Sequence, residues 1–255
     1  DSGADTGPDA GAADADAGPT DTGVQPWCAT PPPGFVRVAA GDFVMGAAND
    51  QPGSQFRDRP QHPVRLTRDF WIGATEVTQE EWSRLMPNNP SFHTGCARCP
   101  VENVSWDEAV DYVNALSTSC GLTTCYPALA ADRQFFTLSL DCTGFRLPID
   151  AEWEHATRAG TTTAFFNGEP LASSGSMPEP RMAGYGWTVG STMTHPVGEL
   201  MPNPFGLYDV YGNVAEMTSD GRRAYVASMT AVVDPVGPGW MIARPSLRGG
   251  AIGSP

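Results

Sequence analysis

The sequence predicts an α+β fold that is rich in loops, with short strands and two to three helices. Its 255 residues include 28 glycines and 24 prolines, which leave little room for long regular elements. Two helix-capping signatures each precede an apolar helical face. Short alternating stretches in the first third of the chain are typical of strands. A chain of this length is expected to form one domain around one core.

Alternating apolar residues indicate four strands near the start of this domain. Phe35–Val38 and Asp42–Gly46 are separated by only a few residues, and together they predict a short hairpin. Val64–Thr67 and Phe70–Ile72 are expected to form further strands.

Two helices are predicted by capping boxes, in which a hydroxyl and a carboxylate each satisfy a backbone amide at the helix start. Thr78 with Glu81 forms the first, and Ser105 with Glu108 forms the second. The second box precedes apolar residues at three-and-four spacing, so one face of that helix is expected to be buried.

A third helix is expected after Pro148, ending at Gly160 where a left-handed residue suits a helix end. Arg146, Glu152 and Glu154 bracket its start. They could act as acid and base, but paired charges at a helix start are more often structural ion pairs, and we favour that interpretation.

Aromatic side chains on the predicted helices are expected to serve packing. Trp82, Trp106 and Trp153 lie on apolar helical faces and are interpreted as core anchors. The histidines show no metal-ligand spacing and no neighbouring serine nucleophile motif, so none is a catalytic candidate: His62, His93, His155 and His195.

Residues 1–30 are interpreted as a disordered acidic tether, and residues 31–255 as the folded domain. The first 26 residues hold six aspartates among Gly, Ala, Pro and Thr, with no basic residue. Such a segment cannot bury enough apolar surface to offset the entropy of ordering. Similar tethers follow the signal sequence or lipid-anchored cysteine of exported bacterial proteins, so we expect a periplasmic, cell-surface or extracellular location and a lipid anchor upstream of Asp1.

The charge balance argues against two classes of partner. A formal net charge of -14 lacks the basic footprint needed to bind nucleic acid or an anionic membrane surface. No run of eighteen apolar residues is present, so no transmembrane segment is predicted.

Six cysteines form an even set that allows fifteen disulfide pairings. We favour disulfides, because export makes them stable. Two further interpretations stay open: free thiols, and a zinc site formed by Cys96-x2-Cys99 and Cys120-x4-Cys125. A redox role for the first pair is disfavoured because no strand-helix-strand pattern surrounds it. The set comprises Cys28, Cys96, Cys99, Cys120, Cys125 and Cys142.

Six colinear segments between about residues 35 and 250 resemble the formylglycine-generating enzyme family, also called sulfatase-modifying factors. They read GDFVMG, RPQHPVRLTRDFWIGATEVT, CPVENVSWDEAVDYVNALS, FRLPIDAEWEHATRAGTTTAFFNG, HPVGELMPNPFGLYDVYGNVAEMTSD and LRGG. The resemblance implies a fold related to C-type lectins, with little regular secondary structure and calcium supporting its loops.

The best candidate site lies between Asp209 and Glu216. Calcium takes six to eight oxygen ligands, and a tight loop with a glycine between two carboxylates can present both carboxylates and its own carbonyls. The resemblance implies that the Asp209 and Glu216 side chains and the Gly212 and Val214 carbonyls hold the ion. The competing interpretation is a turn in which Asp209 and Asn213 cap local backbone.

The chain departs from the family pattern where that family carries out its chemistry. The family binds copper through a cysteine pair shortly after the RGG motif, and thiolates are the ligands suited to Cu(I). Here Arg248-Gly249-Gly250 is followed by only five residues up to Pro255, without cysteine. We therefore expect a domain that is incomplete at its C-terminal end relative to the family.

Milder departures occur elsewhere. Ile149 replaces a helix-capping threonine, at a cost of about 1 kcal/mol unless Asp150 takes over the cap. Ala215 and Met217 replace two tryptophans.

Two functions follow as hypotheses. The first is an exported, non-catalytic, calcium-supported scaffold that binds a protein, peptide or glycan. The second is a copper-dependent oxidase that converts a sulfatase cysteine to formylglycine, with copper bound only if a catalytic segment exists beyond Pro255. A structural module without a ligand of its own is a third option.

Overall fold

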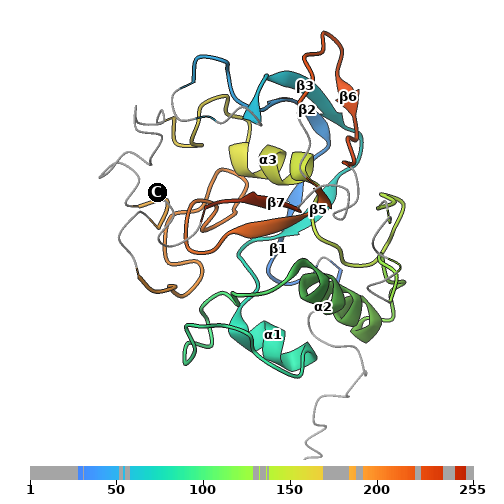
Figure 1. Cartoon of the computed structure of the whole chain (residues 1–255), viewed down its shortest axis with the longest axis vertical. Coiled ribbons are helices and arrows are strands. Elements are labelled where there is room, and N and C mark those ends of the chain that lie inside the picture. Colours follow the sequence, from blue (N-terminus) through green and yellow to red (C-terminus); the bar gives the residue numbers. More distant parts are fainter. Residues whose placement is uncertain are drawn as a thin grey trace, which may run out of the picture.

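A computed structural model describes eleven stretches of the chain, and everything below concerns these residues. They are 28–30, 32–51, 54, 58–128, 132, 136, 138–168, 184–187, 192–221, 225–237 and 245–250. The predicted tether therefore lies outside the described residues up to position 27. The α+β prediction is confirmed: the described residues form short strands and three helices, and some of the strands lie between α3 and the other two helices (Figure 1).

The first four strands form one long, bent antiparallel ribbon. β1 (Phe35–Val38) pairs with β4 (Phe70–Gly73), and β2 (Gly41–Met45) pairs with β3 (His62–Leu66). β3 also pairs in parallel with β6 (Val232–Val233).

The predicted hairpin between the first two strands is wrong. Ala39 and Ala40 lie between β1 and β2. Neither has the left-handed backbone conformation that a tight hairpin turn requires. Instead, the Ala40 amide donates to Asp69 Oδ1 at 2.7 Å, across the ribbon. β1 and β2 therefore do not pair with each other. They follow one another along one side of the ribbon, and both pair with the segment 62–73 on the other side.

All three predicted helices are present. α1 (Gln79–Leu85) and α2 (Trp106–Ser119) each begin with the predicted capping box. α3 (Asp150–Arg158) ends at Ala159 and Gly160, both left-handed, with φ of 45° and 86°. Figure 1 shows α1 and α2 together at one end of the molecule, away from α3, which contacts both β2 and β5 (Glu216–Gly221).

The start of α3 is capped from another element. The Ile149 amide donates to the Glu152 carboxylate at 3.0 Å, and the Asp150 amide donates to Asp220 of β5 at 2.7 Å. Asp150 therefore does not take over the cap that a threonine would provide. The Ile149 side chain is fully buried and packs in the core, while the Asp220 carboxylate accepts the hydrogen bond at the start of the helix.

The core has two parts. The larger surrounds α1 and α2, where Trp82 stacks on Tyr112 with ring centroids 5.2 Å apart. Trp106 joins α2 to β5 by donating its indole hydrogen to the Thr218 carbonyl at 3.0 Å. Trp82, Trp106 and Trp153 are all buried, which confirms them as core anchors. The smaller part lies under the loop that precedes β5: Val38, Ala156, Phe165, Phe166, Leu207, Val210 and Tyr211.

All six cysteines are paired. The disulfides are Cys28–Cys120, Cys96–Cys99 and Cys125–Cys142. The zinc interpretation is wrong for these residues, because each of its four sulfurs is bonded to another sulfur. Cys28, inside the predicted tether, is joined to the residue that caps the end of α2.

Candidate functional site

The loop from 209 to 214 is held in an unusual backbone conformation directly before β5. Asp209, Gly212 and Asn213 all have left-handed φ values, of 55°, 94° and 54°. A Cβ atom at position 212 would lie 2.0 Å from the Trp187 carbonyl oxygen, so no residue with a side chain fits there. The glycine of the predicted calcium motif is thus required by a close approach between two segments.

Asp209 is almost completely enclosed, with 1% of its surface exposed. Its Oδ1 accepts from the Trp187 indole at 2.9 Å, and its Oδ2 accepts from the Gly198 amide at 2.7 Å. Burial raises the pKa of this carboxyl, and these two donors lower it in part. Asp209 therefore sits where a negative charge is only partly compensated by protein groups.

Glu216 opens β5 on the other side of the loop. Its Oε2 accepts from the Trp153 indole at 2.9 Å. Burial raises the pKa of Glu216 to about 7, the indole opposes that rise, and the charge of Asp209 adds to it. The two predicted carboxylate ligands are thus close enough to repel each other, and a bound cation would relieve that repulsion.

The Gly249 backbone shows what surrounds the second oxygen of Glu216. A Cβ built on Gly249 would lie 3.5 Å from the Val210 carbonyl oxygen, 3.6 Å from the Val214 carbonyl oxygen and 3.7 Å from Glu216 Oε1. Three oxygens therefore border one small volume beside the RGG motif. The Gly212 amide donates to the Gly249 carbonyl at 2.8 Å and fixes the motif against the loop.

This donor set suits a hard cation such as calcium, because it consists of carboxylate and carbonyl oxygens. Within the described stretches, no three His, Cys, Asp or Glu side chains are grouped so that they could hold one metal ion. The predicted set needs only two side chains, from Asp209 and Glu216, and takes its other ligands from the Gly212 and Val214 carbonyls. Calcium at this loop stays a prediction.

The alternative of a locally capped turn describes only part of the geometry. Asn213 is fully buried; its Oδ1 accepts from the His195 amide at 3.0 Å, and its Nδ2 donates to the His195 carbonyl at 3.3 Å. Asp209 likewise bonds to Gly198. Both side chains cap backbone, but that backbone belongs to the 195–198 segment rather than to their own turn.

The charged residues around α3 form structural ion pairs, as expected. Arg146 binds the Glu152 carboxylate with two hydrogen bonds of 2.7 Å. Arg158 donates to Glu154 at 2.8 Å, and Arg248 of β7 (Pro245–Arg248) donates to Asp150 at 2.5 Å. Each of these carboxylates pairs with an arginine, which supports their interpretation as structural ion pairs.

Sequence reasoning missed two kinds of residue near the loop. Trp153 was assigned to the core alone, although its indole also binds Glu216. Glu76 is not among the predicted site residues, yet it is a buried carboxylate on which the charges of Glu216 and Asp209 act. The sequence offers little signal for a site role of Glu76, because Asp209 and Glu216 are more than 130 positions away along the chain.

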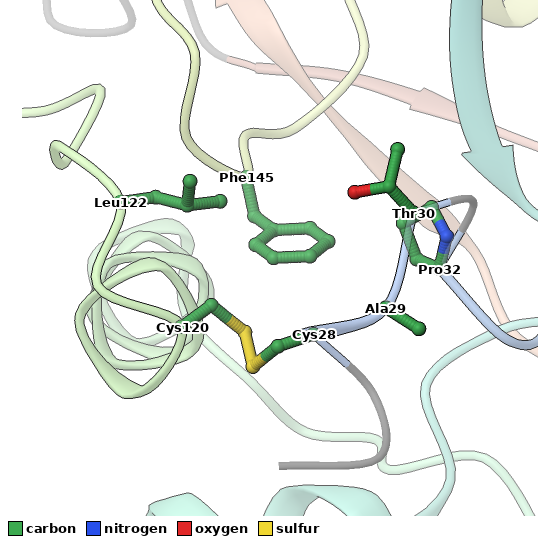
Figure 2. Close-up of a pocket in the computed structure, with 7 residues that line it drawn as sticks. All are labelled: Cys28, Ala29, Thr30, Pro32, Cys120, Leu122 and Phe145. Carbon is green, nitrogen blue, oxygen red and sulfur yellow. A yellow bond between two sulfur atoms is a disulfide. The ribbon is translucent and has the colours of Figure 1, made fainter. Parts of the chain in front are cut away.

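A separate small pocket lies where the N-terminal segment meets the end of α2. Figure 2 shows the Phe145 ring above the Cys28–Cys120 disulfide, with Leu122 on one side and Thr30 and Pro32 on the other. The remaining lining residue is Ala29. No titratable side chain lines it, so this pocket offers no acid-base chemistry.

Comparison with known proteins defines the class of this domain. The family described as "Sulfatase-modifying factor enzyme 1-like domain" matches residues 21–251. The chain therefore belongs to the sulfatase-modifying factor family, the family of the formylglycine-generating enzymes.

Individual relatives carry different names. The chain is 32% identical to "Chaperone protein LppX" of Paenibacillus barcinonensis over 68% of this chain and 69% of that protein. It is 26% identical to the formylglycine-generating enzyme of Streptomyces coelicolor over 86% of this chain and 78% of that protein. The solved structure of Treponema denticola variable protein 1 matches with a TM-score of 0.70 at 33% identity, covering 86% of this chain and 84% of that one.

Proposed function

We propose that this chain is an exported bacterial binding domain that uses the family's fold without its oxidase chemistry, and that calcium supports its 209–216 loop. The observation that carries the proposal is the state of the sulfur atoms. All six cysteines are in disulfides, so these 255 residues present no thiolate pair for Cu(I).

Two relatives support a binding role. The Paenibacillus protein is named a chaperone, and the Treponema protein is named a variable protein; neither name describes an oxidation. A chaperone binds other polypeptides, which favours a protein or peptide over a glycan as the partner of this chain. Export is supported by the three disulfides, which persist in oxidising compartments. No helix in the described residues is long and apolar enough to cross a bilayer.

Calcium support is tested by thermal unfolding after treatment with EDTA. Calcium at 100 times its dissociation constant should stabilise the fold by about 2.7 kcal/mol, because it binds only the folded loop. An Asp209→Asn variant should lose most of this gain, while magnesium should give a smaller one. A melting temperature that does not respond to calcium removes the metal from the proposal.

The oxidase is the second candidate, favoured by the 26% identity to the Streptomyces enzyme. The chain is incubated with Cu(I), oxygen and a CxPxR peptide, and the peptide mass is followed for conversion of cysteine to formylglycine. We expect no conversion. A variant with Cys96→Ser and Cys99→Ser serves as the control, because it tells whether that pair, once reduced, can bind copper. Conversion by the unaltered chain would end the scaffold proposal.

A further inference from the structure

Glu76 is a buried carboxylate without a hydrogen-bond partner. Only 9% of the residue is exposed, and within the described part of the chain neither Oε1 nor Oε2 accepts a hydrogen bond. Buried carboxylates are normally paired with a cation or with several donors. The carboxylate therefore requires an explanation that the folded chain alone does not provide.

The segment carrying Glu76 lies directly against the 209–216 loop. The Tyr208 amide donates to the Ala74 carbonyl at 2.8 Å. Next along the chain, the Thr75 methyl group lies 3.8 Å from the position that a Cβ on Gly198 would occupy. Gly198 is the residue whose amide binds Asp209, so the backbone around Glu76 borders the site on this side.

The charges of the two predicted ligands act on the Glu76 carboxylate, which lies on the segment that borders the loop. Its pKa is raised well above the usual range, first by burial and then by the charges of Glu216 and Asp209, while the nearby backbone amides of Glu76 itself and of Val214 oppose that rise without forming a hydrogen bond of normal geometry. Val214 is also the residue whose carbonyl borders the volume beside Gly249. Carboxylates from three separate segments thus act on one another beside the 209–216 loop.

We propose that Glu76 is a third carboxylate of the cation site, an assignment that rests on the calcium-binding function proposed above. Asp209 and Glu216 would contact the ion, and Glu76 would act on it from beyond the direct ligands, since no three acidic side chains in the described residues are grouped closely enough to ligate one ion. Its charge raises the affinity of the loop for a divalent cation, as groups beyond the direct ligands do at other metal sites. In the metal-free protein the same charge is uncompensated.

The test compares the full chain with a Glu76→Gln variant, which keeps the shape and removes the charge. Calcium affinity is measured by titration calorimetry after EDTA treatment. We expect the dissociation constant for calcium to be 10- to 100-fold higher in the variant. We also expect the calcium-free variant to melt at a higher temperature than the calcium-free parent. A residue that only packs the core would not weaken calcium binding while stabilising the metal-free protein.

Terbium provides a second readout from the same samples. The Trp153 and Trp187 indoles bind Glu216 and Asp209, so excitation of tryptophan should sensitise terbium emission at this site. Half-saturation should move to higher terbium concentration in Glu76→Gln by a factor similar to that for calcium. Glu76→Asp keeps the charge and should retain more affinity than Glu76→Gln.

Glu80→Gln is the matched control. Glu80 lies on α1, is half exposed and pairs with Arg84 on the surface, so its neutralisation should leave calcium affinity within twofold. If the parent binds calcium and Glu76→Gln binds it equally well, the role of Glu76 is refuted and the calcium site stands. If the parent binds neither calcium nor terbium, both proposals fail together.

Discussion

Gly212 shows how a single position determines the shape of the candidate site. Its φ of 94° is unfavourable for other residues, and a Cβ there would lie 2.0 Å from the Trp187 carbonyl oxygen. A Gly212→Ala substitution must therefore move one of two backbone segments. We expect a loss of about 2–4 kcal/mol in the free energy of unfolding, measured by urea denaturation.

Gly34→Ala separates the two causes of that loss. Gly34 also has a positive φ, of 77°, but a Cβ there would meet nothing within 4 Å. Its substitution should cost only the backbone strain, about 1 kcal/mol. Equal losses for the two variants would mean that the contact with Trp187 is unimportant.

At the scale of residues, the sequence predicts candidate ligands that belong to one short motif and misses the carboxylate that the fold brings close to them. Asp209, Gly212 and Glu216 are recognisable because they occupy one loop. Glu76 is not, because its relation to Glu216 depends on how the segment after β4 packs against that loop. Burial without a partner is a property of the folded molecule, and no local pattern reports it.

At the scale of elements, the start of α3 depends on a carboxylate from β5. Asp220 accepts from the Asp150 amide at 2.7 Å and from the Gly237 amide at 3.0 Å. Burial, followed by the nearby charge of Asp150, raises the pKa of Asp220 to about 6, although these amides favour its charged form. The residue thus caps the helix and joins α3 to the loop after β6.

This raised pKa predicts how stability depends on pH. The folded protein holds a proton on Asp220 up to about pH 6, whereas the unfolded chain releases it near the model-peptide value of about 4. The contribution of Asp220 to the free energy of unfolding is therefore most favourable below about pH 4 and is lost as the pH rises through about 6. The expected loss from Asp220 is about 2–3 kcal/mol.

Urea denaturation in EDTA at pH 4.5 and pH 7 measures that loss. The decrease should be smaller in Asp220→Asn, which cannot ionise. Asp141→Asn should behave like the parent, because the Asp141 side chain is 82% exposed and pairs with Arg68 on the surface. An Asp220→Asn variant whose stability falls as steeply as that of the parent would contradict the assigned pKa shift.

The elements that the sequence predicted well are those with local causes. Both capping boxes and the left-handed end of α3 involve residues within a few positions of each other. Strand partners are set by non-local pairing, so Phe35–Val38 could not be assigned to β4 from alternation alone. The cap of α3 was missed for the same reason, since Asp220 is distant in the sequence.

At the scale of the whole molecule, the disulfides constrain very different lengths of chain. Cys28–Cys120 spans 92 residues and holds the N-terminal segment against the end of α2, beside the pocket of Figure 2. Cys96–Cys99 spans only 3 residues. The short loop that it closes binds the start of α1. The Gln79 amide donates to the Cys99 carbonyl, and the Glu80 amide donates to the Ala97 carbonyl.

Removing each pair as a double alanine variant should therefore have unequal effects. Loop-closure entropy gives a loss of about 4–5 kcal/mol for Cys28–Cys120 and about 1–2 kcal/mol for Cys96–Cys99. Denaturation of both variants under oxidising conditions, with calcium present, measures the two losses. Both variants lose two sulfurs, so chain entropy is the main difference between them. The Val197 amide also donates to the Arg98 carbonyl at 3.0 Å, so the short loop contacts both α1 and the 194–197 segment. A larger loss at Cys96–Cys99 would mean that the loop stabilises the molecule through these contacts rather than through constraint of the unfolded chain.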